Sequence, residues 1–281
     1  MRYSVSVFAF SVGIVGTGSL HAQCKVDKSS NEAKLLAYYA APLAFSPSGS
    51  LGVMKAGAIR LGFDVTLIPP PGDDLRRTSI CFLPKEENSQ LSPIFPRPHL
   101  TVGLGGGFFV EAMYLPPITV LDATPNMASI AVGFARALSP KAGFALRAHT
   151  TFGEVKGPIT CNNQALQSVS PNGACFGDNP SEDTYKPNIF GGEAALTFQP
   201  AAKLSAYASA GLSSLKPRFQ VGFQPRNTTF DSTRVVVDLT RFSLQLGGAY
   251  HLSSKIAVTA EVYSVPQDMT TVRFGGTWNV R

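Results

Sequence analysis

The sequence predicts an all-β fold, a closed antiparallel up-and-down transmembrane β-barrel of about ten strands with a short N-terminal helix. Three observations predict it. Apolar and polar residues alternate over most of the chain after residue 50. The connections between these alternating segments are short and long in turn. Charged residues make up only 15% of the 281 residues, which is low for a surface that meets water.

The first residues have the layout of a secretory signal peptide. Arg2 supplies a positive charge, residues 5–16 are uncharged and largely apolar, and Ala22 ends a stretch of small and polar residues. The apolar stretch is too short to cross a ~30 Å bilayer core as a helix. We therefore expect residues 1–22 to be a signal peptide and the exported chain to begin at residue 23.

Residues 23–50 are predicted to form an N-terminal periplasmic or plug segment. Ser29 and Glu32 have the spacing of a capping box. The residues that follow are rich in alanine, leucine and tyrosine without alternation, and Pro42 ends the pattern. This predicts a short helix over 30–41. The helix would lie near the periplasm, where it would either cap the mouth of the barrel or enter the lumen as a plug.

The barrel is predicted over residues 51–281. Alternation of apolar and polar residues predicts nine strands, at 51–68, 99–115, 127–138, 142–156, 188–199, 203–213, 233–252, 255–265 and 270–280. Bacterial single-chain barrels have an even number of strands. We therefore infer a tenth strand over residues 76–83, reached by a turn at 69–74, although its alternation is poor. A barrel of eight strands with one hairpin outside is the alternative.

The lengths of the connections predict the orientation of the barrel. In outer-membrane barrels the turns at the periplasmic side are short and the loops at the outer side are longer. This places the C-terminus at the periplasm and the loop 157–187 outside. The short connections are 138–142, 199–203 and 252–255, and the long ones are 115–125, 157–187 and 224–232.

Four cysteines follow the expected leader, and an even number in an exported chain predicts two disulfides. Cys161 and Cys175 lie in one polar loop and are the obvious pair. That leaves Cys24 with Cys81, which the inferred tenth strand would place at the periplasmic end. The other two pairings stay open. The cysteines lack CxxC spacing and nearby histidines, so we expect no metal or cofactor.

The polar faces of the strands favour a barrel in lipid over a soluble sandwich. The wet face of a sandwich is usually rich in Lys and Glu. Here it carries glycine, serine, threonine and sparse charges of both signs, which suits pairing inside a lumen. The network could simply fill the lumen, or it could form a constriction that selects solutes. Its predicted members are Arg60, Asp64, Glu111, Arg147, His149, Glu193, Arg241, Glu261 and Arg273.

Residues 273–280, RFGGTWNV, resemble the C-terminal signal by which bacterial outer-membrane β-barrels are recognised for assembly. The signal reads polar, any, Gly, any, any, aromatic, any, hydrophobic, and Gly275, Trp278 and Val280 match it. The chain departs from it by ending the motif in Val280 rather than an aromatic residue, and by adding Arg281. The resemblance implies an outer-membrane protein whose partners are lipid and the barrel assembly machinery.

Sequence motifs predict no catalytic role. The chain has no nucleophile elbow, P-loop or HExxH motif. Its net charge of +6 is scattered, whereas nucleic-acid binding needs a clustered patch. We predict a monomeric, porin-like barrel with a structural, anchoring or narrow passive-pore role. An apolar plug would suit a carrier of small hydrophobic compounds, and a secreted β-sandwich that binds a ligand or partner is a third hypothesis.

Overall fold

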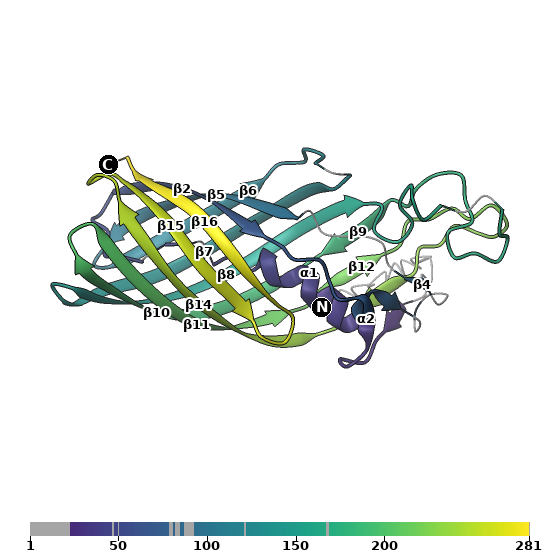
Figure 1. Cartoon of the computed structure of the whole chain (residues 1–281), viewed down its shortest axis with the longest axis horizontal. Helices are drawn as coiled ribbons and strands as arrows, with labels where there is room; N and C mark the ends of the chain where they lie inside the picture. The colour runs from purple at the N-terminus through teal and green to yellow at the C-terminus, as the bar shows by residue number, and fades with distance from the viewer. Residues whose placement is uncertain are drawn as a thin grey trace, which may run out of the picture.

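The structure, a computed structural model, describes residues 23–46, 48–49, 51–78, 81, 85–86, 93–120, 122–166 and 169–280. The expected leader, residues 1–22, lies outside the described residues. Within them, ten antiparallel strands form one closed ring, and a short helix lies at the N-terminal side (Figure 1). The predicted fold class is confirmed. Both the eight-stranded alternative and the soluble sandwich are wrong.

The ring closes where the last strand of the chain pairs with the first, from Val272 opposite Leu67 to Asn279 opposite Arg60. Closure leaves the ring without a free sheet edge. In ring order the strands are β2 (Ile59–Leu67), β5 (Ile94–Gly105), β6 (Phe108–Leu115), β7 (Thr124–Ser139), β8 (Ala142–Gly157), β10 (Ile189–Ala201), β11 (Leu204–Leu215), β14 (Leu239–His251), β15 (Ile256–Val265) and β16 (Met269–Asn279).

The two ends of the barrel differ. The C-terminus and the turns after β7, β10 and β14 lie together at one end, which we call the short-turn end (Figure 1). We call the opposite end the loop end. There a set of short strands, the extension, pairs with the end of β8 at Val155 and continues the sheet beyond the barrel. The extension consists of β9 (Asp183–Lys186), β12 (Arg218–Gln220), β13 (Arg234–Val236) and β1 (Gln23–Lys25).

The tenth strand is not the one predicted over 76–83. The described residues there form the end of α2 (Asp73–Arg76) and β3 (Arg77–Thr78), which pairs with β4 (Lys85–Glu86) outside the barrel. The additional strand arises because the predicted strand 99–115 is a hairpin. Gly105, Gly106 and Gly107 have φ of +88°, +61° and +90°, which only glycine adopts readily. Alternation continues on both sides of this turn and conceals it.

The N-terminal helix enters the loop end of the barrel. It comprises α1 (Asn31–Ala40) and the 3-10 turn η1 (Ala41–Leu43), so it ends close to the predicted residue. Its N-cap is Ser30, whose Oγ accepts from Ala33 N at 3.1 Å, and not Ser29. The helix lies at the end opposite the one predicted.

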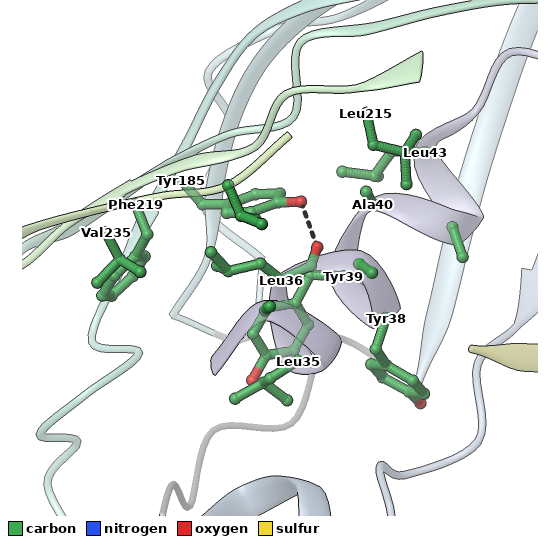
Figure 2. Close-up of a cluster of buried hydrophobic side chains, with 14 of the residues drawn as sticks. Leu35, Leu36, Tyr38, Tyr39, Ala40, Leu43, Tyr185, Leu215, Phe219 and Val235 are labelled. Carbon is green, nitrogen blue, oxygen red and sulfur yellow. Dashed lines mark hydrogen bonds between the residues drawn. The ribbon is translucent and has the colours of Figure 1, made fainter. Parts of the chain in front are cut away.

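Apolar contacts hold the helix between the barrel and the extension. Figure 2 shows Leu36 and Tyr39 of α1 beside Tyr185 of β9, with Phe219 and Val235 further to the left in the same cluster. Tyr185 Oη donates to the Leu36 carbonyl at 2.9 Å. Because the helix is buried on all sides, its apolar residues need no alternation or single stripe.

On another side of α1, Tyr38 Oη donates to the Pro69 carbonyl, just beyond the end of β2. Burial raises the pKa of the Tyr38 hydroxyl to about 12, so it remains a protonated donor even in moderately alkaline solution. The helix is therefore fastened to the first strand of the barrel as well as to the extension.

Both expected disulfides, Cys24–Cys81 and Cys161–Cys175, are present. Cys24–Cys81 lies at the loop end, however, and not at the end predicted. The physical reason is the direction of β2, which starts at the short-turn end and delivers the chain that contains Cys81 to the loop end. The bond joins β1, just before the helix, to the connection between β2 and β5.

The barrel is apolar outside and polar inside, the reverse of a water-soluble protein. Phe63, Val132 and Leu196 point outward and are 51%, 55% and 59% exposed. Inward positions of the same strands hold buried charged and hydroxyl side chains, such as Asp64 and Ser129. None of the helices among the described residues is long and apolar enough to cross a bilayer.

The two disulfides should stabilise the fold unequally. They close loops with sequence separations of 57 and 14 residues. On the chain-entropy account, replacing Cys24 and Cys81 by serine should cost about 4 kcal/mol of unfolding free energy, and replacing Cys161 and Cys175 about 3 kcal/mol. Urea unfolding in detergent micelles measures both. Equal losses, or a larger loss for the second pair, would contradict this expectation.

Candidate functional site

Residues 44–46 and 48–49, here called the lumen segment, follow the helix and run along the barrel interior toward the start of β2. Ala44, Phe45, Ser46 and Ser48 are buried. Side chains on three separate barrel strands donate to backbone carbonyls at the start of this segment and just before it. These contacts are Thr151 Oγ1 to Leu43 O at 3.1 Å, Arg97 Nη1 to Ala44 O at 3.2 Å and Arg273 Nη1 to Ser46 O at 2.7 Å.

Arg147 is at the centre of the strongest ion pairs. Its Nη1 lies 2.6 Å from Glu111 and its Nη2 lies 2.6 Å from Glu193, and all three side chains are buried. Ser46 of the lumen segment joins them, with its Oγ 2.8 Å from Glu193 and 3.1 Å from Arg147 Nη2. Charged hydrogen bonds of this length are strong in a dry interior. The segment is thus part of the network.

A second cluster forms around Asp64, which is fully buried. Arg97 donates to its carboxylate from Nε at 2.9 Å. The amide of Ser48 donates to the other carboxylate oxygen at 3.2 Å. His99 Nε2 is 3.7 Å from that oxygen, beyond hydrogen-bond distance. A carboxylate on the wall therefore binds the backbone of the lumen segment.

A third cluster forms around Glu261. Its carboxylate accepts from Tyr207 Oη at 2.7 Å and from Gln245 Nε2 at 2.5 Å, and it pairs with Arg273 at 3.2 Å. Tyr207 Oη in turn accepts from the amide of Gly49 at 2.9 Å. Both ends of the lumen segment are therefore bound by the wall.

The inward-facing charges balance. The arginines on the inner wall of the described strands are Arg60, Arg97, Arg147, Arg241 and Arg273. The carboxylates are Asp64, Glu111, Glu193 and Glu261, together with Asp268, which pairs with Arg241 from the turn before β16. Equal numbers of opposite charges give the lumen no strong field of one sign that would attract cations or anions. The arrangement is that of a self-neutralising network that surrounds the lumen segment.

The predicted residues do not all lie in this network. Arg241 pairs instead with Asp268 at 2.8 Å, in the turn between β15 and β16. Arg60 bonds to Asn279 at 2.9 Å near the short-turn end, and His149 is buried on β8 near the centre. The remaining six predicted residues, Asp64, Glu111, Arg147, Glu193, Glu261 and Arg273, form the clusters described above.

Sequence reasoning missed Arg97 because it placed the start of the strand at residue 99. Alternation carried back from Thr101 through His99 would have found it, because β5 begins at Ile94. Tyr207 and Gln245 were on the predicted polar faces but carry no charge. No sequence pattern identifies Ser46 and Ser48, because a segment threaded through a lumen has no periodic alternation of apolar and polar residues.

Two hollows flank the lumen segment. At the loop end, a cavity of about 200 Å³ lies between the helix and the wall, lined by Tyr39, Leu43 and Met127 among others. We call it the apolar cavity. At the short-turn end a polar hollow of about 60 Å³ is lined by residues that include Arg60 and His251. No group of three or more potential metal ligands is found within the described residues.

The fold and site define a class of protein, a small closed β-barrel with an apolar outer surface and a lumen occupied by its own N-terminal segment. No family model matches the sequence. A search of curated proteins finds no relative.

Several solved structures are similar to the chain. The attachment invasion locus protein Ail of Yersinia pestis is 9% identical, with 80% of this chain and 99% of that chain covered and a TM-score of 0.30. The toluene transporter TodX of Pseudomonas putida is 12% identical, with coverages of 85% and 69% and a TM-score of 0.34. The N-terminal β-barrel domain of Pseudomonas aeruginosa OprF is 10% identical, with coverages of 80% and 99% and a TM-score of 0.29.

Replacing Arg147 by methionine should destabilise the barrel strongly. The variant leaves Glu111 and Glu193 buried without their partner, which costs about 3–5 kcal/mol when a buried pair is broken. Arg218→Met is the matched control, because Arg218 forms an exposed pair with Asp238 worth about 0–1 kcal/mol. Unfolding in detergent measures both. Similar losses of unfolding free energy in the two variants would show that the buried pairs of Arg147 stabilise the barrel no more than an exposed pair does.

Proposed function

We propose that the protein is an outer-membrane β-barrel closed to water and ions by its own N-terminal segment, with a structural or anchoring role. The observation that carries this proposal is the lumen segment, which is hydrogen-bonded to the inner wall at several heights. A passive pore needs a continuous polar path, lined by groups that interact weakly with the solute. Here the polar groups of the wall bind the chain itself.

The placement in a membrane is supported by the surface of the barrel. Half-exposed apolar side chains surround it, and its ten strands form a closed ring, the architecture by which strands cross lipid. With the longer loops outside, the short-turn end would face the periplasm. The exported chain would then begin at the outer side and thread inward through the lumen before forming its first strand.

The network also favours a permanent plug over a gate. Arg97 and Arg273 use guanidinium groups to hold backbone carbonyls, and such charged hydrogen bonds each contribute about 1.5–3 kcal/mol. Withdrawing the segment would break several of them together and deprive each of these buried arginines of one acceptor. The closed state is therefore the stable one.

A charge on the outer wall tests the membrane setting. Val132 is 55% exposed and lies halfway along β7. In lipid, Val132→Arg should cost about 2–4 kcal/mol, whereas on a wet surface it would change stability by about 0.5 kcal/mol or less. Ala202→Arg, in the exposed turn after β10, is the matched control and should be neutral. Folding into vesicles gives the free energies, and a neutral Val132→Arg would exclude the membrane-facing wall.

Conductance tests the closure. Purified protein in planar bilayers should be silent, while a chain whose leader is fused to Leu51, with Cys81→Ser to remove the free thiol, should conduct. The full-length Cys24→Ser, Cys81→Ser protein is the control for the lost disulfide and should stay silent. Heat-modifiable mobility on gels shows which samples are folded. Steady conductance of the folded full-length protein would overturn the proposed closure.

A further inference from the structure

The wall of the barrel is weak at one place. β5 and β6 pair only from Leu100 opposite Ala112 toward their shared turn. Both strands continue beyond this point toward the loop end, β5 as far as Ile94 and β6 as far as Leu115. We call the part of this stretch around the two prolines, residues 95–99 beside residues 113–115, the seam. On its other side β5 remains paired with β2 past this point, from Val102 opposite Ile59 as far as Ile94 opposite Leu67.

Two prolines explain why only one side of β5 loses its partner. The amide and carbonyl of a strand residue point to the same neighbour, and those of the next residue point to the other. Gly103 N donates to Ala58 O and Pro93 O accepts from Ile68 N. The backbone amides and carbonyls of the odd-numbered residues of β5 therefore point to β2. Pro96 and Pro98 are even-numbered and would face β6. They remove both donors that the seam needs.

The apolar cavity lies directly behind the seam. Phe95 and Pro96 of β5 and Leu115 of β6 line it, together with Leu43 of the plug. Ile94 also lines it and is 48% exposed, so the cavity reaches the outer surface of the protein. At this height the neighbouring positions on the ring, Leu67 and then Val272, are exposed and apolar, which places the seam within the apolar belt.

The lining restricts the chemistry of a ligand. No described residue that lines the cavity is charged, and of its two tyrosine hydroxyls, on Tyr39 and Tyr185, that of Tyr185 is already bonded to Leu36 O. A carboxylate or phosphate would therefore be buried without a cation to pair with, at high cost. An apolar cavity of about 150 Å³ stays dry and binds benzene, so about 200 Å³ suits an uncharged hydrocarbon of one ring.

We propose that the apolar cavity binds a small uncharged hydrophobic molecule, which passes between cavity and membrane through the seam between β5 and β6. This rests on the proposed membrane setting but not on a particular cellular role. The lumen segment closes the axial route from the cavity toward the short-turn end at the central network, and the lateral route is the one that leads an apolar molecule from the cavity into the membrane. The strand donors missing at Pro96 and Pro98 make separation of the two edges inexpensive.

Restoring the missing donors tests the route. Pro96→Val, Pro98→Val supplies two amides facing β6 and lets the hairpin extend, whereas Pro200→Val, in an exposed part of β10, is the matched control. The reporter is Phe95→Trp at the cavity in a Trp278→Phe background. The probe is bromobenzene, added to vesicles containing the folded protein, which quenches tryptophan on contact. Each variant is first shown to be folded in the bilayer by heat-modifiable mobility.

We expect rapid quenching in the reporter protein and in the Pro200→Val control. In the double proline variant the quenching rate should fall about tenfold, because two ladder hydrogen bonds now oppose opening. Slowed hydrogen exchange at the Tyr114 amide would show that the hairpin has extended. Unchanged quenching in a variant with an extended hairpin would overturn the lateral route.

Occupancy is tested separately. Crystals soaked in bromobenzene should show bromine anomalous density between Phe95 and Leu115, and Leu115→Trp, which fills the cavity, should abolish it. Bromine elsewhere, or quenching by acyl-brominated phospholipid that bromobenzene does not displace, would overturn the proposed ligand class. A protein that fails to enter bilayers at all would instead contradict the proposed membrane setting.

Discussion

The buried guanidinium of Arg147, held between Glu111 and Glu193, is the interaction on which the interior of the barrel depends. A ring of ten strands whose outer surface is apolar must direct its polar side chains inward. Those side chains meet in a narrow space where an unpaired charge is costly. The arginines and carboxylates of the inner wall therefore have to neutralise one another, and their equal numbers achieve this.

The same constraint explains how the N-terminal segment can occupy the lumen. An extended chain brings amides and carbonyls that need partners. The wall supplies them from charged groups, through Arg97 and Arg273 to carbonyls and through Asp64 to the amide of Ser48. The segment completes hydrogen bonds that the network would otherwise lack, so plug and wall stabilise each other. The closure of the lumen that we propose follows from these shared hydrogen bonds.

The two edges of strand β5 differ in their backbone hydrogen bonding. In β5 the odd-numbered residues Arg97 and His99 point into the lumen, and their backbone groups pair with β2. The even-numbered Pro96 and Pro98 point outward and give β6 no donors. The tripeptide Pro-Arg-Pro thus fixes the strand on one side and frees it on the other. The apolar cavity lies behind the side that is freed.

Much of the barrel could be predicted from the sequence because alternation records which side of a wall each residue faces. Alternation predicted the all-β class and the polar lumen around Arg147 and Glu193. The even number of cysteines predicted two disulfides, and the structure decided between the possible pairings. The rule that bacterial barrels have an even number of strands led to the right count of ten, although the strand added to reach it, residues 76–83, was the wrong one. The turn at Gly105–Gly107 keeps the phase of its two strands, so a period of two cannot reveal it.

The tertiary structure alone decided where the N-terminal segment goes. Its helix has no alternation, and the end of the barrel that it enters depends on Tyr185 and Phe219, which lie far away in the sequence. The partners of Ser46 and Ser48, and the alignment of the seam with the apolar cavity, likewise arise only when the ring closes. The sequence by itself determined which residues face inward, because that is a local property of each strand. Which of them meet depends on ring closure and on the path of the chain through it.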